Sequence, residues 1–412
     1  MLFSIPLSGL DAASEDLSVI SNNLANLNTD GYKNETVSFK DLLYQDYGAS
    51  GAGSPIQIGT GVAVEGTATN FGDGTVSSTG VSTNMAISGN GFFVTEKNGV
   101  TQYTRAGNFT TNSSGQLTTP DGQLVLGYPA VDGAISLSSA AGPLNLGEGV
   151  SSPASATNAF SLVTNLNADA QVGNSFSTPL TVYDSLGDQH TLTFTFTKTA
   201  TNSWSYAITL PGADTGAASP TNVASGTLSF DENGNLTSPG SAIAGIAVSG
   251  LANGAGTLNL TWNLSGTGGS SDLTQLAAAS STSATNQNGH ASGTLQSFSV
   301  DSDGVVNGMF SNQQTMTLGQ VALATFANEQ GLERVGDNGY VATAASGDPT
   351  VGVAGSGGRG SITGGAVELS NVDVAAEFTN MIIAQRGYEA NAKVVTTFDT
   401  LSQDTLSMVP VA

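Results

Sequence analysis

The sequence predicts a mainly β protein whose N- and C-terminal α-helices form a coiled-coil-like inner domain, with β-rich inner and outer domains between them. Two observations predict this fold. Apolar residues recur at alternating spacings of three and four over residues 1–30 and again over 366–408, which is the pattern of a helical seam. Between these ends, runs rich in Thr, Val and Phe are broken by Gly, Asn and Asp, as in a succession of short strands.

The first predicted helix ends near residues 28–30, where Gly31 is a candidate left-handed cap. Its apolar residues follow the narrow two-in-seven spacing of a coiled-coil seam, whereas a core helix usually has a broader stripe. We predict that this seam is an assembly interface made of Leu10, Ala13, Leu17, Ile20, Leu24 and Leu27.

The last predicted helix follows Asn371 and Asp373, which are candidate N-caps. Its seam has the same spacing, and the phase slips after its last member. The residues that we predict to belong to the assembly interface here are Val374, Phe378, Met381, Gln385, Tyr388, Ala392 and Val395.

The apolar stripe of each predicted helix is narrow, so neither helix is expected to be stable by itself in water. The first helix is also rich in asparagine, a poor helix former. Two partners are possible for each seam: the other terminal helix of the same chain, or the same helices of neighbouring molecules. The two-in-seven spacing and the position at the chain ends favour packing between molecules.

Turn signals predict the hairpins of the β-rich body. Asn98-Gly99 separates two strand-like runs, and Asp121-Gly122 separates two more. Alternating residues at 191–198 predict a strand that pairs with 202–210. Further hairpins are predicted at 226–238 and 292–312.

Gly, Ser and Ala-rich stretches suggest three domains, two of them discontinuous. We predict a terminal helical domain from residues 1–70 and 366–412, and a β-rich middle domain from 71–146 and 286–365. A β-rich outer domain, residues 147–285, is inserted into the middle one.

Charge and composition exclude several classes of function. The 412 residues contain 9 Lys and Arg against 32 Asp and Glu, a net charge of −23, which is too acidic for a nucleic-acid-binding surface. No apolar run is long enough to insert into a membrane as a helix. Cysteine is absent, so disulfides and thiolate chemistry are excluded. The acidic N-terminal segment does not resemble a cleaved signal peptide.

The sequence offers no catalytic or metal-binding constellation. His190 and His290 lie far apart in the chain without a third ligand, so we predict no metal site, no cofactor and no enzyme activity. Segments 231–235 and 301–304 carry Asp and Asn before Gly, as hairpin turns require. They lack the spacing of a calcium-binding EF-hand loop; turns are favoured, and calcium binding stays open.

Four separated segments resemble bacterial flagellar rod and hook proteins. They are SNNLANLNTDGYK at 21–33, ISGNGFFV at 87–94, YTRAGNF at 103–109 and AQRGYEANAK at 384–393. The residues that carry the terminal signatures are Asn22, Asn23, Ala25, Asn26, Thr29, Gly31, Tyr32, Arg386, Gly387 and Asn391. The large inserted block, with TVYDSLG at 181–187, is similar to the outer domain of the hook subunit.

This resemblance implies a structural subunit that polymerises with itself into the hook, a flexible joint between rod and filament in bacterial motility. It also implies export by the flagellar type III apparatus without a cleaved signal peptide, and an extracellular location. The implied partners are further copies, the distal rod protein, the hook cap or scaffolding protein and the hook–filament junction proteins. A distal rod protein and, more remotely, a surface adhesin are the alternatives; the inserted block argues against the first and the terminal seams against the second.

Overall fold

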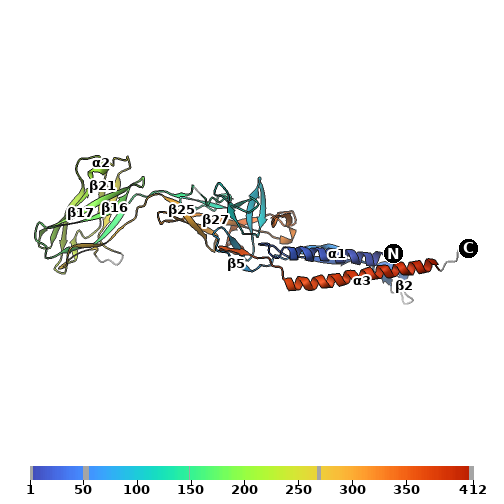
Figure 1. Cartoon of the computed structure of the whole chain (residues 1–412). Coiled ribbons are helices and arrows are strands. Elements are labelled where there is room, and N and C mark those ends of the chain that lie inside the picture. Colours follow the sequence, from blue (N-terminus) through green and yellow to red (C-terminus); the bar gives the residue numbers. More distant parts are fainter. Residues whose placement is uncertain (1–2, 50–54, 148, 267–270, 408–412) are drawn as a thin grey trace. The chain divides into compact units, whose positions relative to one another are not determined.

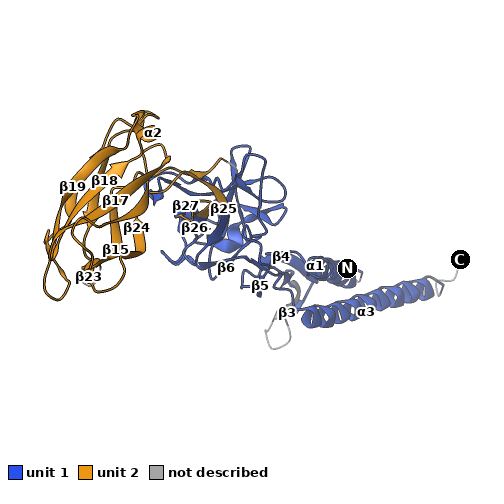
Figure 2. Cartoon of the chain, turned by 60° about the vertical axis from the view of Figure 1, so that its left-hand side comes forward, with its two compact units in different colours: residues 1–148, 297–308, 315–412 blue, residues 149–296, 309–314 orange. Residues whose placement is uncertain are grey.

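The computed structural model describes residues 3–49, 55–147, 149–266 and 271–407, and the chain divides into two compact units (Figure 2). Unit 1 comprises residues 1–148, 297–308 and 315–412, and unit 2 comprises 149–296 and 309–314. The strand-rich chain with a helix near each end confirms the predicted fold class. The three-domain division stays a prediction.

Unit 1 contains the two long helices. Helix α1 spans Ser4–Ala25 and is followed by a turn in which Gly31 has a φ of 68°. Helix α3 spans Val374–Ser407. The carboxylate of Asp373 accepts hydrogen bonds from the backbone N–H groups of Ala375 and Ala376 at 2.9 and 3.1 Å, so the predicted N-cap at this position is confirmed.

Helices α1 and α3 lie side by side (Figure 1). The ring of Phe3 contacts that of Phe398, with centroids 6.0 Å apart. At the other end of α1, Asn23 is hydrogen-bonded to Glu377. The helices are therefore antiparallel, and the expectation that the two ends of the chain pack together is confirmed.

The β part of unit 1 contains one large sheet and several strand pairs. In the large sheet β26, β27, β11, β7, β8, β29 and β28 are successive neighbours, and β9, β10, β12, β13 and β30 pair at its sides. The pairs are β1–β4, β2–β3, β5–β32 and β6–β31. The strands are β1 (Glu35–Asp41), β2 (Gln45–Ala49), β3 (Pro55–Ile58), β4 (Val62–Thr69), β5 (Val76–Ser78), β6 (Met85–Ser88), β7 (Phe92–Lys97), β8 (Val100–Thr104), β9 (Thr110–Thr111), β10 (Leu117–Thr118), β11 (Leu124–Val131), β12 (Ala134–Ile135), β13 (Gly142–Pro143), β26 (Val305–Phe310), β27 (Thr315–Thr325), β28 (Glu333–Gly336), β29 (Gly339–Val341), β30 (Thr350–Val353), β31 (Ser361–Gly364) and β32 (Ala366–Glu368), with a 3₁₀ turn at Glu329–Gly331.

Unit 2 packs two five-stranded sheets face to face. One has the order β16-β17-β18-β19-β20, and the other β21-β22-β15-β23 with β24 on β15. Their inner faces share one core that holds both tryptophans, Trp204 and Trp262. The elements are β14 (Ser151–Ser152), β15 (Ala159–Asn167), β16 (Ser175–Tyr183), β17 (Gln189–Ala200), β18 (Ser203–Leu210), α2 (Gly212–Thr215), β19 (Thr221–Phe230), β20 (Leu236–Ser238), β21 (Ile243–Val248), β22 (Leu258–Asn263), β23 (Leu273–Leu276), β24 (Ser281–Gln287) and the start of β25 (Gly293–Val300).

The predicted hairpins are confirmed. Asn98 and Gly99 have φ values of 53° and 80° and join β7 to β8, as a type I′ turn requires. Asp121-Gly122 joins β10 to β11, and β17 pairs with β18. The later hairpins are β19–β20 and β25–β26.

Phe194→Ala is expected to lower the free energy of unfolding of unit 2 by about 3–5 kcal/mol, because it leaves a cavity between the sheets. Phe194 is completely buried and contacts the rings of Phe160 and Trp262. Tryptophan fluorescence during urea unfolding reports on this unit, since both tryptophans lie in it. Thr195→Ala, on the opposite face of the same strand, is the matched control and is expected to cost less than about 1 kcal/mol. Equal losses for both variants would contradict the assignment of this core.

Candidate assembly interface at the terminal helices

The side chain of Asn23, on α1, is hydrogen-bonded to other segments of the chain. It is only 1% exposed. Its Oδ1 accepts hydrogen bonds from the Tyr32 hydroxyl at 3.2 Å and the Glu35 N–H at 3.0 Å. Its Nδ2 donates to the Glu35 carbonyl at 2.8 Å and to Glu377 Oε1 at 3.1 Å. All four hydrogen-bonding positions of the amide are therefore used, and one side chain joins α1, the start of β1 and α3.

A buried cluster of charged residues also joins the N-terminal and C-terminal parts of unit 1. Lys33 Nζ lies 2.6 Å from Glu368 Oε1, and Arg105 Nη1 lies 3.3 Å from Glu368 Oε2. Burial, with the nearby charge of Arg105, lowers the pKa of Lys33, whereas Glu368 opposes the shift. We call Asn23, Lys33, Glu368 and Glu377 the terminal junction, because together they join residues near the N-terminus to residues near the C-terminus.

Gly31 is required by the close approach of two backbones. Its N–H donates to the Glu368 carbonyl at 2.7 Å. A Cβ at this position would lie 2.5 Å from the backbone nitrogen of Ala106, and its φ of 68° is unfavourable for other residues. The motif glycine therefore sets the path of the chain from α1 into the junction.

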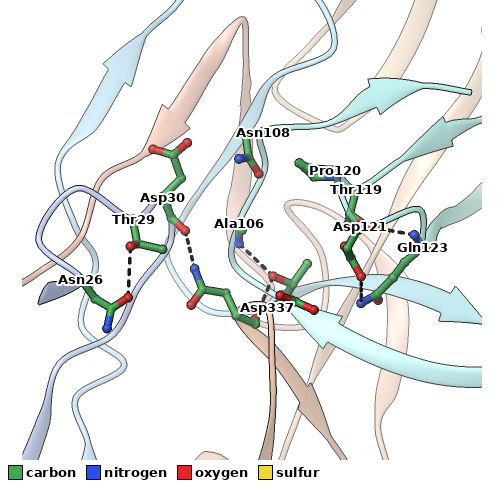
Figure 3. A pocket seen from close by; sticks show the side chains of 12 residues that line it. Asn26, Thr29, Asp30, Ala106, Asn108, Thr119, Pro120, Asp121, Gln123 and Asp337 are labelled. Atoms are coloured by element: carbon green, nitrogen blue, oxygen red, sulfur yellow. Dashed lines mark hydrogen bonds between the residues drawn. The ribbon is translucent and has the colours of Figure 1, made fainter. Parts of the chain in front are cut away.

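The remaining N-terminal motif residues fix the turn after α1, beside a polar cleft (Figure 3). Asn26 Oδ1 accepts a hydrogen bond from Thr29 Oγ1 at 3.1 Å, and the Asp30 carbonyl accepts one from Asn338 Nδ2 at 2.8 Å. The Asn22 amide donates to the Tyr32 hydroxyl at 3.1 Å. The cleft wall is thus held together by its own hydrogen bonds. Ala25 is exposed.

The C-terminal motif residues divide between two sides of α3. Asn391 packs against α1, since a Cβ on Gly9 would lie 2.8 Å from its amide. Arg386 is exposed and pairs with Glu389 at 2.9 Å. Gly387 has no atom within 4 Å of its Cβ position beyond its own helix backbone and chain neighbours. Only Asn391 among these three therefore serves the contact within the chain.

The predicted seam residues fall into three groups. Ile20 is buried. Five residues of the predicted N-terminal seam and three of the α3 seam are half-buried, namely Leu10, Ala13, Leu17, Leu24, Leu27, Met381, Ala392 and Val395, and Leu27 lies beyond the end of α1 at Ala25. Four residues of α3 are exposed, namely Val374, Phe378, Gln385 and Tyr388. The contact within the chain thus leaves much of the α3 seam uncovered.

Sequence analysis missed part of this interface. The charged members Glu368 and Glu377 belong to no periodic pattern, so no sequence signal identified their partners. Exposed Ile382, Ile383, Val394 and Leu401 on α3 also lay outside the predicted seam. The intervals of eleven and seven between Ile383, Val394 and Leu401 place these three on one side of a helix, and this periodicity was the signal that could have found them.

The two segments that sequence analysis considered for calcium binding form hydrogen-bonded turns. The carboxylate of Asp231 accepts hydrogen bonds from the N–H groups of Asn233 and Asn235, both at 2.8 Å, and Asp301 makes the same kind of turn with Asp303 and Val305. Among the described residues, no group of three or more His, Asp or Glu side chains is placed to hold a metal ion. None of the helices in the described part of the chain is long and apolar enough to cross a membrane.

His190 is buried between two carboxylates. Its Nε2 lies 3.1 Å from Asp184 Oδ2 and its Nδ1 lies 3.2 Å from Asp214 Oδ2. Burial raises the pKa of Asp184, but hydrogen bonds from Asn253, His190 and backbone amides outweigh it and lower this pKa to about 2. His290 has different partners, including Asn312 at 3.2 Å.

Comparison with known proteins assigns the family. Family models match four successive segments: a flagella basal body rod protein over residues 5–33, the flagellar hook protein FlgE/F/G D1 domain over 86–159, the flagellar basal body protein FlaE D2 domain over 145–290 and the flagellar basal body rod FlgEFG protein C-terminal segment over 363–408. The chain is 39% identical over 416 residues to the flagellar hook protein FlgE of Salmonella typhimurium, covering 97% of this chain and 98% of that protein. The chain belongs to the flagellar hook protein family.

Other hook proteins are similar over nearly the whole length. Identity is 37% over 417 residues with FlgE of Escherichia coli, covering 97% of this chain and 98% of that protein. It is 33% over 455 residues with FlgE of Treponema pallidum, covering 98% of each chain. The predicted resemblance to flagellar rod and hook proteins is therefore confirmed, and so is the prediction that the chain is similar to the hook subunit and not to a rod protein.

Acidification is expected to tighten the docking of α1 on α3. Burial raises the pKa of Glu377; hydrogen bonds from Asn23 and Asn34 lower it, and the charges of Asp16 and Asp373 raise it further. The folded state therefore disfavours the ionised carboxylate. Its stabilising contribution is fully present below the ordinary pKa of 4.5 and is lost as the pH rises through the raised value.

Hydrogen exchange in the first turns of α3, corrected for intrinsic rates, measures this effect between about pH 4 and pH 7. Glu377→Gln is expected to remove the pH dependence, whereas exposed Glu389→Gln is the control and should retain it. An unchanged pH profile in Glu377→Gln would show that another group is responsible.

Proposed function

We propose that this chain is the structural subunit of a flagellar hook, which polymerises with itself through its terminal helices and transmits torque from the basal-body rod to the filament. Its role in this proposal is mechanical and not catalytic. The observation that carries the proposal is the near-full-length similarity to hook proteins, combined with a helix pair whose apolar seam is only partly covered within the chain.

Exposed apolar side chains on α3 supply the driving force for assembly. Phe378 is 53% exposed and Tyr388 is 43% exposed in the solitary chain. Each 100 Å² of apolar surface removed from water contributes about 2.5 kcal/mol, so a contact of a few hundred Å² stabilises the helix pair by several kcal/mol. Packing against further copies thus orders helices that are weak alone.

The β-rich parts would lie outside an inner tube of helices and touch one another through polar surfaces. Unit 2 has one basic residue, Lys198, and the outward face of β17 carries Thr191, Thr193, Thr195 and Thr197. Uncharged hydroxyl surfaces make many weak contacts, directly or through water. Such contacts can shift when a tube bends, whereas ion pairs favour one register.

The proposed partners are further copies of the chain, the distal rod protein, the hook cap or scaffolding protein, the hook–filament junction proteins and the type III export apparatus. We propose an extracellular location after export without cleavage of a signal peptide. Supporting this, α1 is one half of the packed helix pair, so cleavage within it would remove the partner of α3.

Phe378→Ser is expected to reduce the yield of polymer at least tenfold while leaving the melting temperature of the solitary chain nearly unchanged, because the ring is already half in solvent. Negative-stain microscopy and sedimentation measure the polymer. Val131→Ser, which alters another apolar residue, 73% exposed and away from the helices, is the control. Curved tubes are expected from the unaltered chain, and equal loss of polymer in both variants would contradict the role of Phe378.

Added salt is expected to accelerate polymerisation. Copies with a net charge of −23 repel one another, and raising the ionic strength from about 0.01 to about 0.1 M shortens the screening length from about 30 to about 10 Å. Light scattering at constant protein concentration measures the growth rate. A rate that falls over this range would contradict the electrostatic part of the proposal.

A further inference from the structure

The chain contains seven asparagines that are followed directly by a glycine. In such a pair the backbone nitrogen of the glycine can attack the side-chain amide carbon of the asparagine, because glycine has no side chain to hinder the approach. The attack requires that the asparagine side chain and the peptide group between the two residues are free to rotate. Local hydrogen bonding therefore decides which pairs can react in the folded chain.

Four of the pairs are held by a hydrogen bond to the connecting peptide group. In the pair that begins at Asn90, its carbonyl accepts a hydrogen bond from the Gly360 N–H at 2.7 Å. In three others the glycine N–H is a donor, namely at Gly234, Gly254 and Gly289. Rotation of any of these peptide groups must first break that hydrogen bond.

Two further pairs are held by the asparagine side chain. Asn307 Oδ1 accepts a hydrogen bond from Thr317 Oγ1 at 3.1 Å. Asn338 Nδ2 donates to the Asp30 carbonyl at 2.8 Å. Each side chain must leave its partner before its amide carbon can be attacked.

The remaining pair, Asn98-Gly99, has none of these restraints. Both residues are exposed, and beyond its chain neighbours nothing lies within 4 Å of the Cβ position of Gly99. Among the residues that the structure describes, neither the Asn98 side chain nor the peptide group between the two residues has a hydrogen-bond partner.

The hairpin turn also brings this pair close to the geometry of the reaction. Asn98 and Gly99, with φ values of 53° and 80°, form the two-residue turn between Lys97 and Val100. Types I′ and II′ both close such a turn, and both have a positive φ at the first turn residue. The central peptide group can therefore flip without displacing β7 or β8. The flip carries the Gly99 nitrogen to the side on which the Asn98 Cβ lies.

We propose that Asn98 is a site of spontaneous deamidation, with water as the only co-reactant. The Gly99 nitrogen bonds to the Asn98 Cγ, the bond from Cγ to Nδ2 breaks, and ammonia leaves with the proton of the Gly99 N–H. Water then opens the five-membered succinimide ring. Cleavage between the ring nitrogen and Cγ gives aspartate, and cleavage between that nitrogen and the backbone carbonyl carbon gives isoaspartate.

The two products affect the hairpin differently. Asp-Gly fits a type I′ turn, as Asn-Gly does. Isoaspartate instead routes the backbone through the side chain and adds one backbone atom to the loop, so the two-residue turn is lost. Either product adds a negative charge to a chain whose net charge is already −23. This inference does not depend on the proposed function.

Ageing of the full-length chain in mildly alkaline buffer tests the site. Digestion and mass spectrometry at intervals give the deamidation rate of each of the seven pairs, in the folded chain and in urea. In the folded chain Asn98 is expected to react at least tenfold faster than any other pair, because the others must first open locally. In urea the seven rates are expected to be similar, since no pair is then held.

Two outcomes of this experiment would overturn the assignment. One is a rate at Asn98 in the folded chain that does not exceed the rates of the other pairs. The other is the same preference for Asn98 in urea, because the neighbouring sequence and not the turn would then be responsible.

Hydrogen exchange tests the effect of the isoaspartate product on the β7–β8 hairpin. The aged chain, separated from unmodified chain by anion exchange, is expected to exchange faster at the hairpin end than the fresh chain. Fresh Asn98→Asp is the matched control, since it carries the added charge without the longer backbone, and it should exchange like the unaltered chain. Equal exchange in isoaspartate-containing and fresh chains would overturn the predicted loss of the turn.

Discussion

The architecture depends on the terminal junction, where buried polar groups join the two ends of a long chain. Asn23 and Glu377 are 354 residues apart in sequence, and Lys33 and Glu368 are 335 apart. Closing such a loop costs conformational entropy, and burying the charges of Lys33 and Glu368 costs solvation energy. An apolar contact could offset these free-energy costs in many registers of the two helices. The hydrogen bonds of the terminal junction form in only one register. The junction therefore specifies where α1 meets α3.

Different residues set the register of the helix pair and supply apolar surface for further contacts. Polar residues fix the register of the helix pair within one chain, whereas many apolar residues of α3, such as Phe378 and Ile383, stay exposed. Apolar contact is non-directional, so exposed stripes can hold several neighbours once the polar residues have set the geometry. The register of the helix pair is thus set within one chain, and exposed apolar surface remains available for contacts with other copies.

Local parts of the fold could be predicted from the sequence because their causes are local. The turn at Asn98-Gly99, the alternation in β17 and the cap at Asp373 each depend on a few adjacent residues. The partners of Glu368 and Glu377 could not be predicted, since a buried charge leaves no periodic signal. On α3, three- and four-residue spacing occurs on more than one face, so the pattern alone did not tell which face meets α1.

The asparagines of α1 show why a locally unfavourable residue is retained. Asn22, Asn23 and Asn26 lower the intrinsic stability of the helix, yet each uses its amide to bind a residue beyond or within the following turn. The helix is consequently weak until the turn, β1 and α3 are in place.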